Sequence, residues 1–277
     1  MNLKKTLTLA GSDTSGGSGI QADLKTFQEH GTYGMTALTC IVSMDPEAGW
    51  KHNVFPTDSA AVEAQLKCAF SVGLDAMKTG MLGSVEIVEL GAKYIDKYGL
   101  NNVVIDPVMV CKGEDEVLLP ETVDAARELL LPKAIITTPN LFEAGQLSQL
   151  GTLRSIDDMK HAAQKIYDLG AKNVVIKGGR ALQHDKAVDL FYDGNSFVLL
   201  ETEKLETSYN HGAGCTFAAA ITANLANGES IFDAVLHAKK FVTAAIAHGW
   251  KLNEFVGPVM HGAFNRFPGS VSVTASR

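Results

Sequence analysis

Apolar strand-like segments alternate with amphipathic helical segments along most of the 277-residue chain, and this alternation restricts the fold more than any other feature. Strands buried on both faces are continuous apolar runs, and helices between them act as crossover connections, so the pattern predicts an α/β fold built on a mostly parallel sheet. The expected strands are 7–10, 36–44, 102–106, 134–138 and 173–176, with another starting at 75.

Helical segments are expected between these strands and in the last third of the chain. Their starts carry capping residues, with Thr57 or Ser59 as candidates for one helix, Ser84 for another, and Ser155 with Asp158 as a capping box. The expected helices are 20–30, 57–70, 84–98, 120–130, 214–226, 230–248 and 254–265, with two more starting at 141 and 156.

Two short strands at 187–192 and 197–200 flank an Asp-Gly-Asn turn and predict an antiparallel hairpin at one edge of the sheet. Residues 51–56 are interpreted as a short strand or edge segment. No internal repeat, low-complexity tract or linker divides the sequence. We therefore expect a single domain over 1–277, with helices covering both faces of the sheet.

Composition narrows the classes of function. The net charge is −7 and the pI is about 5.6, whereas a protein that binds nucleic acid or an anionic membrane is usually more basic. No apolar run reaches the length of a membrane span. The four cysteines, Cys40, Cys68, Cys111 and Cys215, have no metal-site or disulfide-framework spacing. We expect a cytoplasmic protein with a small-molecule ligand.

In open parallel sheets, ligands bind outside the carboxyl ends of the strands. Many of the predicted strands end in polar or charged residues, which we expect to lie together. These residues are Ser12, Asp13, Asp45, Lys78, Asp106, Asn140, Glu143, Lys177 and the loop 211–215.

The segment 209–221 contains two closely spaced glycines followed by an alanine-rich helix. Free N–H groups and the helix dipole at such a start can hold a phosphate, and they can lower the pKa of Cys215 so that it is partly thiolate at neutral pH. The segment lacks the Lys-Ser/Thr pair of a Walker A loop and the third glycine of a dinucleotide fingerprint. A plain turn before a core helix, with an inert cysteine, is the alternative interpretation.

Together, the strand-end residues provide what phosphoryl transfer requires. Asp106, Asn140 and Glu143 can organise Mg²⁺, and Lys177 can hold a phosphate as a point charge. Each residue also has an ordinary interpretation as a strand stop, a helix cap or a solvated strand end. Their combination favours a phosphotransferase, because that chemistry depends mainly on positioning and charge neutralisation.

Six segments in order resemble the hydroxymethylpyrimidine (phosphate) kinase branch of the ribokinase-like superfamily, and most closely its bacterial pyridoxal/pyridoxine kinases. The resemblance extends over roughly 6–265 and implies a three-layer sandwich, ATP and Mg²⁺ as cofactors, a hydroxymethyl acceptor and a homodimer. The segments are 10–23, 78–82, 106–109, 138–144, 177–179 and 212–216.

The resemblance also implies roles for individual residues. Asn140 and Glu143 are expected at the Mg²⁺–phosphate site, with Asp106 near the metal and the transferred phosphoryl group. Lys177 is expected to contact the ATP phosphates, and Asp189 to lie near the nucleotide.

The anion hole implied by the resemblance consists of Gly212, Ala213 and Gly214. Cys215 occupies the position where the wider superfamily has an aspartate base, and a thiol suits that role only if its pKa is lowered. His211, four residues earlier, is a possible aid to proton transfer or an ordinary hydrogen-bonding residue.

Two departures from the pyrimidine kinase pattern concern the acceptor. Met44 stands where pyrimidine kinases have a Gln or Glu that reads the amino group, and it offers only a soft apolar contact. Cys111 lies in a charged, glycine-containing loop, where we hypothesise that its thiol adds reversibly to the pyridoxal aldehyde. The alternative is that Cys111 is merely a small residue of the loop.

The expected acceptor walls are Gly11, Met44, Met81, Val108 and Cys111, and His52 is a possible contact to the ring's phenolic oxygen. The leading interpretation is an ATP-dependent kinase for the 5′-hydroxymethyl group of pyridoxal, pyridoxine and pyridoxamine in vitamin B6 salvage. A hydroxymethylpyrimidine (phosphate) kinase of thiamin synthesis and a non-catalytic phosphate- or B6-binding module are the alternatives.

Overall fold

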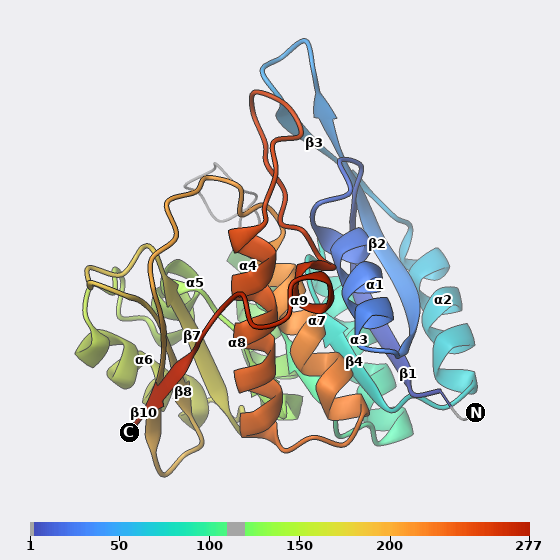
Figure 1. The fold of residues 1–277 in the computed structure, drawn as a ribbon. Coiled ribbons are helices and arrows are strands. Elements are labelled where there is room, and N and C mark those ends of the chain that lie inside the picture. The colour runs from blue at the N-terminus through green and yellow to red at the C-terminus, as the bar shows by residue number, and fades with distance from the viewer. Residues whose placement is uncertain (1–2, 110–119) are drawn as a thin grey trace.

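One sheet of ten strands crosses the computed structural model, which describes residues 3–109 and 120–277 (Figure 1). The strand order is β10-β9-β8-β7-β6-β5-β4-β1-β2-β3. The strands are β1 (Lys5–Asp13), β2 (Tyr33–Asp45), β3 (Lys51–Pro56), β4 (Ala76–Thr79), β5 (Val103–Ile105), β6 (Ile136–Thr137), β7 (Val174–Gly179), β8 (Ala187–Tyr192), β9 (Phe197–Thr202) and β10 (Thr274–Ser276).

The six strands from β7 to β2 in this order are parallel, as the alternating pattern predicted. Consecutive residues of the central strands face opposite cores. Val103 and Ile105 join the core on one face, whereas Val104 joins the core on the other. Because both faces are covered, these strands need apolar residues at every position.

Helices cover both faces of the sheet, which confirms the predicted layers. They are α1 (Gly19–Glu29), α2 (Ser59–Ser71), α3 (Val85–Tyr98), α4 (Pro120–Ala125), η1 (Ala126–Leu130), η2 (Leu131–Lys133), α5 (Leu141–Ser148), α6 (Ile156–Asp168), α7 (Ala213–Ala226), α8 (Ile231–Ala247) and α9 (Ala263–Arg266).

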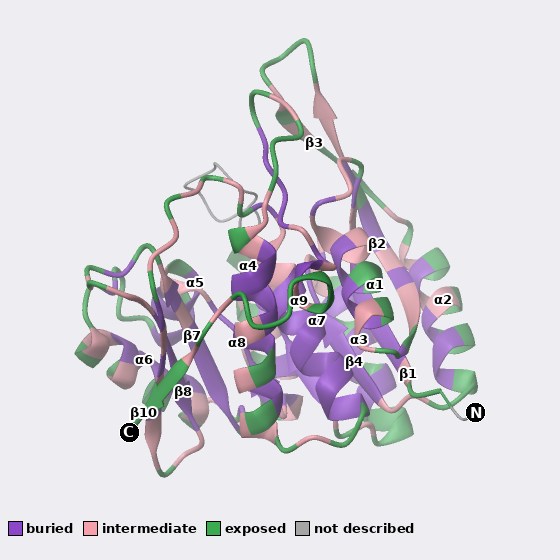
Figure 2. Cartoon of the chain, viewed as in Figure 1, coloured by how far each residue is buried: buried purple, intermediate pink, exposed green. Residues whose placement is uncertain are grey.

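The helices divide into two groups. Buried residues of α2, α3, α5 and α6 form one core with the sheet, and those of α7 and α8 form the other, with α1 beside α7 (Figure 1). Every residue of α7 from Thr216 to Ala226 is buried, and Figure 2 shows this helix among the most buried parts of the molecule. The alanine-rich sequence of α7 fits this central position, because small side chains allow close packing on all sides.

Both edges of the sheet are antiparallel, whereas the sequence predicted an antiparallel addition at one edge. The predicted hairpin is present as β8 and β9, and β10 extends it. At the opposite edge β3 pairs antiparallel with β2, and together they project beyond the sheet (Figure 1). Trp50, between these two strands, stacks on Phe255 at 6.0 Å between ring centroids.

Two local predictions were wrong. The cap of α2 is Asp58, whose carboxylate accepts from the Ala60 N–H, and neither Thr57 nor Ser59 has this role. In the expected helix 254–265 only α9 is helical, because Gly257 and Pro258 interrupt it. The expected helix over 120–130 is confirmed: it is α-helical to Ala125 and continues as the π-helical turn η1 to Leu130.

In residues 3–109 and 120–277, none of the helices combines the length and apolarity that crossing a bilayer requires.

Candidate active site

Two cavities meet at the carboxyl ends of the parallel strands. The first, which we call the central cavity, has a volume of about 350 Å³ and is bordered by the ends of β1, β2 and β4 and by the start of α7. The second, the side cavity, has a volume of about 310 Å³ and lies between β8, β9 and α8. Five residues border both cavities: Asn140, Lys177, Asn210, Ala213 and Gly214.

The loop before α7 lies at this junction and is held by tight packing. Gly212 has a left-handed φ of 82°, and a Cβ at this position would overlap the Gly17 carbonyl oxygen, so only glycine fits. His211 on the same loop exchanges backbone hydrogen bonds with Gly257 and Val259, both of 3.1 Å. The first N–H groups of α7 lack intrahelical partners, so this junction favours an anion.

Lys177 adds a full positive charge at the same place. A Cβ on Gly214 would lie 3.3 Å from its Nζ atom, which shows that the ammonium packs against the helix start. Lys177 Nζ donates to Asp106 Oδ1 at 3.1 Å, and Thr138 Oγ1 donates to the same oxygen at 2.8 Å. Burial lowers the pKa of Lys177, but the charges of Asp106 and Glu143 outweigh burial and raise the pKa above its ordinary value. Lys177 is therefore charged and is not a solvated strand end.

Asn140 and Glu143 begin α5 with a capping box. The Asn140 N–H donates to Glu143 Oε2 at 2.8 Å, and the Glu143 N–H donates to Asn140 Oδ1 at 2.9 Å. Burial raises the pKa of Glu143 to about 7, with Asp106 adding to the rise and Lys177 opposing it. A cation that binds beside these two carboxyl groups would favour their ionised forms.

Asp106 and Glu143 are suited to Mg²⁺ bound partly through water. The described residues contain no group of three or more His, Cys, Asp or Glu side chains that would form a closed metal cage. Mg²⁺ commonly keeps several waters and binds through one or two carboxylates plus substrate phosphates. The carboxyl groups of Asp106 and Glu143 repel each other when both are ionised, and a metal ion that arrives with a phosphate would relieve this repulsion.

Cys215 lies in the first turn of α7 and borders the central cavity. Its Sγ atom is 3.3 Å from Ser18 Oγ, and Ser18 does not use this hydroxyl to cap α1. The expectation of a lowered thiol pKa was wrong for the unliganded protein. Burial raises the pKa of Cys215, and the charge of Lys78, which acts against the rise, does not reverse it.

Asp13 organises the loop 11–19 and binds it to the loop before α7. Its Oδ2 atom accepts from His211 Nε2 at 2.7 Å and from the Ser18 N–H at 2.8 Å, and its Oδ1 atom accepts from the Ser15 N–H at 2.8 Å. Burial raises the pKa of Asp13, but the hydrogen bonds from His211 and Ser15 lower it below its usual range. His211 is thus the partner of a buried carboxylate.

The remaining wall of the central cavity is largely apolar. Gly11, Met44, Met81 and Val108 line it as predicted, and so does His52, which pairs with Met44 across β2 and β3. A Cβ on Gly11 would lie 2.7 Å from Cys40 Sγ, so this wall position requires glycine. Cys111 lies outside the described residues.

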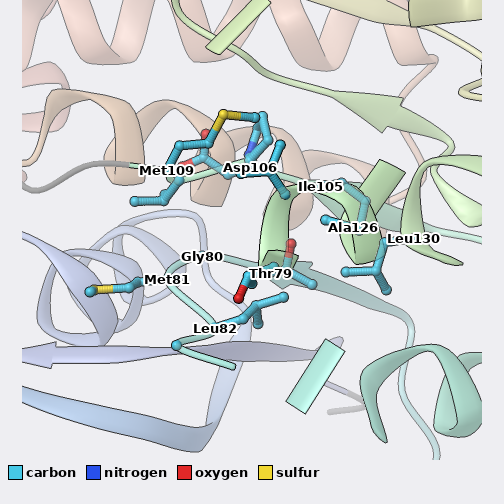
Figure 3. A pocket seen from close by; sticks show the side chains of 14 residues that line it. Thr79, Gly80, Met81, Leu82, Ile105, Asp106, Met109, Ala126 and Leu130 are labelled. Carbon is cyan, nitrogen blue, oxygen red and sulfur yellow. The ribbon is translucent and has the colours of Figure 1, made fainter. Parts of the chain in front are cut away.

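A smaller apolar cavity of about 60 Å³ adjoins this wall between the ends of β4 and β5. Figure 3 shows Met81 and Leu82 on one side of it, Asp106 and Met109 on the other, and Ala126 with Leu130 at its end. Met81, Asp106 and Val108 border both this space and the central cavity.

Asp189 lies in the side cavity, away from Cys215. Its Oδ1 atom accepts from the Gly179 N–H at 3.2 Å, and its Oδ2 atom accepts from Lys239 Nζ at 2.7 Å. Lys239 comes from the middle of α8 and was not singled out from the sequence, because nothing nearby marks it as different from other helix lysines. Here it is buried and lines the cavity.

Most strand-end residues converge as predicted, but Asp45 does not. Its Oδ1 atom accepts from the Glu47 N–H at 2.8 Å and shapes the turn between β2 and β3, and it does not line either cavity. Sequence reasoning also missed Asp23, a fully buried carboxylate of α1 that binds Lys78.

The chain matches the family described as phosphomethylpyrimidine kinase over residues 13–260. The pyridoxine kinase of Bacillus subtilis (strain 168) is 58% identical over 264 residues, covering 95% of this chain and 97% of that protein. The hydroxymethylpyrimidine/phosphomethylpyrimidine kinase of the same organism is 41% identical over 267 residues, covering 96% and 97%.

Solved structures show the same relationship. The pyridoxal kinase from Staphylococcus aureus in complex with AMP-PCP and pyridoxal has a TM-score of 0.94 and 55% sequence identity, covering 100% of this chain and 99% of that one. Sequence and fold agree: the chain belongs to the phosphomethylpyrimidine kinase family.

Proposed function

We propose that this protein transfers the γ-phosphoryl group of ATP to the 5′-hydroxymethyl group of pyridoxal, and also of pyridoxine and pyridoxamine, in vitamin B6 salvage. The observation that carries this proposal is that two cavities meet at a positively charged helix start, and that Lys177 borders both cavities. The 58% identity to a pyridoxine kinase and the similarity to a pyridoxal kinase structure support the choice of acceptor.

ATP occupies the side cavity in this proposal, with its phosphates directed toward the junction. Asp189 and Lys239 lie at its inner end, while Asn140 and Lys177 lie where the two cavities join. The N–H groups of Gly212, Ala213 and Gly214 stabilise the charge on the transferred phosphoryl group, which is the main contribution a protein makes to such a reaction.

Mg²⁺ is bound by Asp106 and Glu143, partly through water, together with the phosphates. When bound, the ion neutralises phosphate charge and helps to orient the γ-phosphoryl group. Asp106, which accepts from Lys177 Nζ at 3.1 Å, would hold the metal together with Glu143, and Lys177 would then be available to a phosphate oxygen.

Cys215 acts as the base for the acceptor hydroxyl. The hydroxyl oxygen forms a bond to the γ-phosphorus, its proton moves to the Cys215 sulfur, and ADP leaves with the electron pair of the broken P–O bond. The location of Cys215 beside Gly214, on the central cavity, supports this role.

Pyridoxal binds in the central cavity against Gly11, Met44, Met81 and Val108. Met44 has no group that can hydrogen-bond a pyrimidine amino substituent, which favours a B6 vitamer over hydroxymethylpyrimidine. From the sequence we further propose that the Cys111 sulfur adds to the aldehyde carbon while the oxygen takes up a proton. Cys111→Ala should then reduce turnover of pyridoxal much more than that of pyridoxine, and equal losses would contradict it.

We also propose that the whole chain is one kinase domain that works in the cytoplasm as a homodimer. The need for ATP supports the location. Ile41 and Phe55 pair across β2 and β3 on the exposed face of the projecting edge, with 44% and 56% of their surfaces accessible. Such an apolar pair suits a contact with a second copy. Light scattering should show a dimer that Phe55→Glu weakens.

The function is tested by incubating the protein with ATP and Mg²⁺ and, in turn, with pyridoxal, pyridoxine and hydroxymethylpyrimidine, while ADP is measured. We expect turnover with both B6 vitamers, and loss of turnover when EDTA removes the metal. Turnover of the pyrimidine alone would identify a thiamin-pathway kinase. Absence of turnover with all three would instead favour a binding module.

A further inference from the structure

An ion pair is sealed beneath the central cavity. Lys78 Nζ of β4 donates to Asp23 Oδ2 of α1 at 2.9 Å, and both side chains have an exposed fraction of 0%. Thr8 Oγ1 donates to the same carboxylate oxygen at 2.6 Å. The other oxygen, Asp23 Oδ1, is buried and has no hydrogen-bond partner among the described residues.

Stability alone does not account for this pair. Removing two charges from water costs several kcal/mol for each ion, and apolar residues of the same size often stabilise a core as well or better. An unpartnered carboxylate oxygen adds to the cost. Keeping a charged Lys78 in the core therefore costs folding free energy that an apolar residue would not. The location of Lys78 indicates where its charge acts.

Lys78 borders the central cavity together with Cys215 and Asp106. A Cβ on Gly80 would lie 3.4 Å from Lys78 Nζ and 2.9 Å from the Ala10 Cβ, so no larger residue can separate this ammonium from the cavity wall. The hydrogen bond to Asp23 Oδ2 holds the ammonium in place.

Lys78 is also the cation that most strongly affects Cys215. Burial raises the pKa of the thiol, Lys78 lowers it, and Asp23 and Asp106 raise it, while Ser18 lowers it through its hydrogen bond. The charge of a Cys215 thiolate likewise raises the pKa of Lys177. Although burial lowers the pKa of Lys78, the charges of Asp23, Cys215 and Asp106 raise it above its ordinary value, so the ammonium stays charged.

We propose that Lys78 is a positioning residue for the phosphoryl transfer: its ammonium, held by Asp23, stabilises the negative sulfur of Cys215 that accepts the proton of the acceptor hydroxyl. This inference rests on the proposed function. In the reaction the Cys215 thiolate takes the proton of the O–H bond to form an S–H bond, the oxygen's electron pair forms the new O–P bond, and the bond from the γ-phosphorus to ADP breaks, with its electron pair leaving on ADP. Lys78 and Asp23 keep their protonation states throughout.

The direct test measures the thiol and does not depend on turnover. The rate of Cys215 alkylation by iodoacetamide is followed against pH by mass spectrometry, for the wild type and for Lys78→Met, which removes the charge and shortens the side chain by one atom. We expect the pH midpoint of alkylation to rise by about one unit or more, as for the loss of a neighbouring opposite charge. Lys67→Met, at an exposed site on α2, is the matched control and should leave the midpoint unchanged.

Lys78→Met leaves Asp23 buried and unpaired, so this variant can fail to fold. The double variant Asp23→Asn/Lys78→Met removes both charges and should fold. Its alkylation midpoint should still rise, but less than in Lys78→Met, because the opposing charge of Asp23 is also absent. A double variant with the wild-type midpoint and wild-type kcat would show that the pair is only structural.

Turnover provides a second readout. With pyridoxine as acceptor, kcat of the folded Lys78 variants at neutral pH should fall about 100-fold, and the loss should shrink as the pH rises. KM for ATP should stay within about twofold, because the side cavity is intact. If the wild type proves inactive on every acceptor, the proposed function fails while the alkylation result stands. If it is active but the variants match it at all pH values, this inference fails.

Discussion

The Lys177–Asp106 and Lys78–Asp23 pairs are alike in chemistry and differ in access. Each joins a strand-end lysine to a buried carboxylate, at 3.1 Å and 2.9 Å respectively. Lys177 keeps 17% of its side-chain surface exposed and borders both cavities, whereas Lys78 and Asp23 are completely buried. An arriving phosphate or metal ion can therefore compete for the first pair but cannot reach the second.

This difference teaches that bond length does not determine the role of an ion pair. Lys93 and Glu63 on the surface are closer, at 2.7 Å, yet water and salt screen both charges. The accessible pair is suited to exchange partners during turnover. The sealed pair is suited to supply a constant field. Four predictions test this contrast, in order of decreasing effect.

Removing the accessible charge should affect catalysis most. Lys177→Met should lower kcat/KM by about 100- to 1,000-fold, because a preorganised charge on the transferred phosphoryl group is lost. Steady-state ADP release measures this, and Lys172→Met, at an exposed site, serves as the control. A loss below about fivefold would show that Lys177 does not contact the phosphates in the transition state.

Removing the sealed charge should affect stability most. Lys78→Met should lower the free energy of unfolding by about 3–5 kcal/mol, because the uncompensated Asp23 carboxylate stays buried. Lys177→Met should cost less, since water in the cavity can reach Asp106. Urea unfolding of the two variants gives the comparison. Equal losses for the two variants would remove the distinction between a sealed and an accessible pair.

Acid should weaken ligand binding at the accessible pair. The pKa of Glu143 is raised to about 7, so this carboxyl group is largely protonated at pH 6 and ionised at pH 8. Because Mg²⁺ requires the ionised form, the affinity for Mg·ADP should fall by about tenfold from pH 8 to pH 6. Isothermal titration calorimetry measures it. A Glu143→Gln variant should bind weakly with little pH dependence, and an unchanged pH response in this variant would assign the effect to another group.

Breaking the exposed pair should have the smallest effect. Lys93→Met removes the 2.7 Å contact with Glu63, but both side chains are already solvated. Neither kcat nor the thermal midpoint should change beyond experimental error. A loss comparable to that of Lys78→Met would mean that the short distance matters more than burial.

Much of the fold could be predicted because the signals are local. The apolar runs specified the parallel strands, and the strand ends specified which polar residues meet, since parallel strands place their carboxyl ends on one side. Asn140, Glu143 and Lys177 were brought together in this way. Residues 51–56 were interpreted as a short strand or edge segment and form β3, whereas β10 depends on its neighbour β9 at the sheet edge, which a short segment does not reveal.

The sealed pair and its effect on Cys215 could not be predicted from the sequence. Asp23 lies between Ala22 and Leu24 in α1, and in the sequence a buried carboxylate looks like an exposed one until its lysine partner is known. Asp13 and the loop 211–215 were expected to lie together at the strand ends, but the hydrogen bond between Asp13 and His211, 198 positions apart, was not predicted. The helix start suggested a lowered thiol pKa for Cys215, but desolvation by the surrounding protein outweighed it, and desolvation is a property of the assembled core. The role of Cys111 stays a prediction.

The close contact between Gly17 and Gly212 has a consequence for synthesis of the protein. The N-terminal loop leaves the ribosome early, but its partner follows nearly 200 residues later. Until then Asp13 lacks its hydrogen-bond partner, the His211 imidazole, and the start of α7 is not there to close the cavity. The reaction centre therefore forms in one late event. A nascent or truncated chain that ends before this point should bind neither substrate productively.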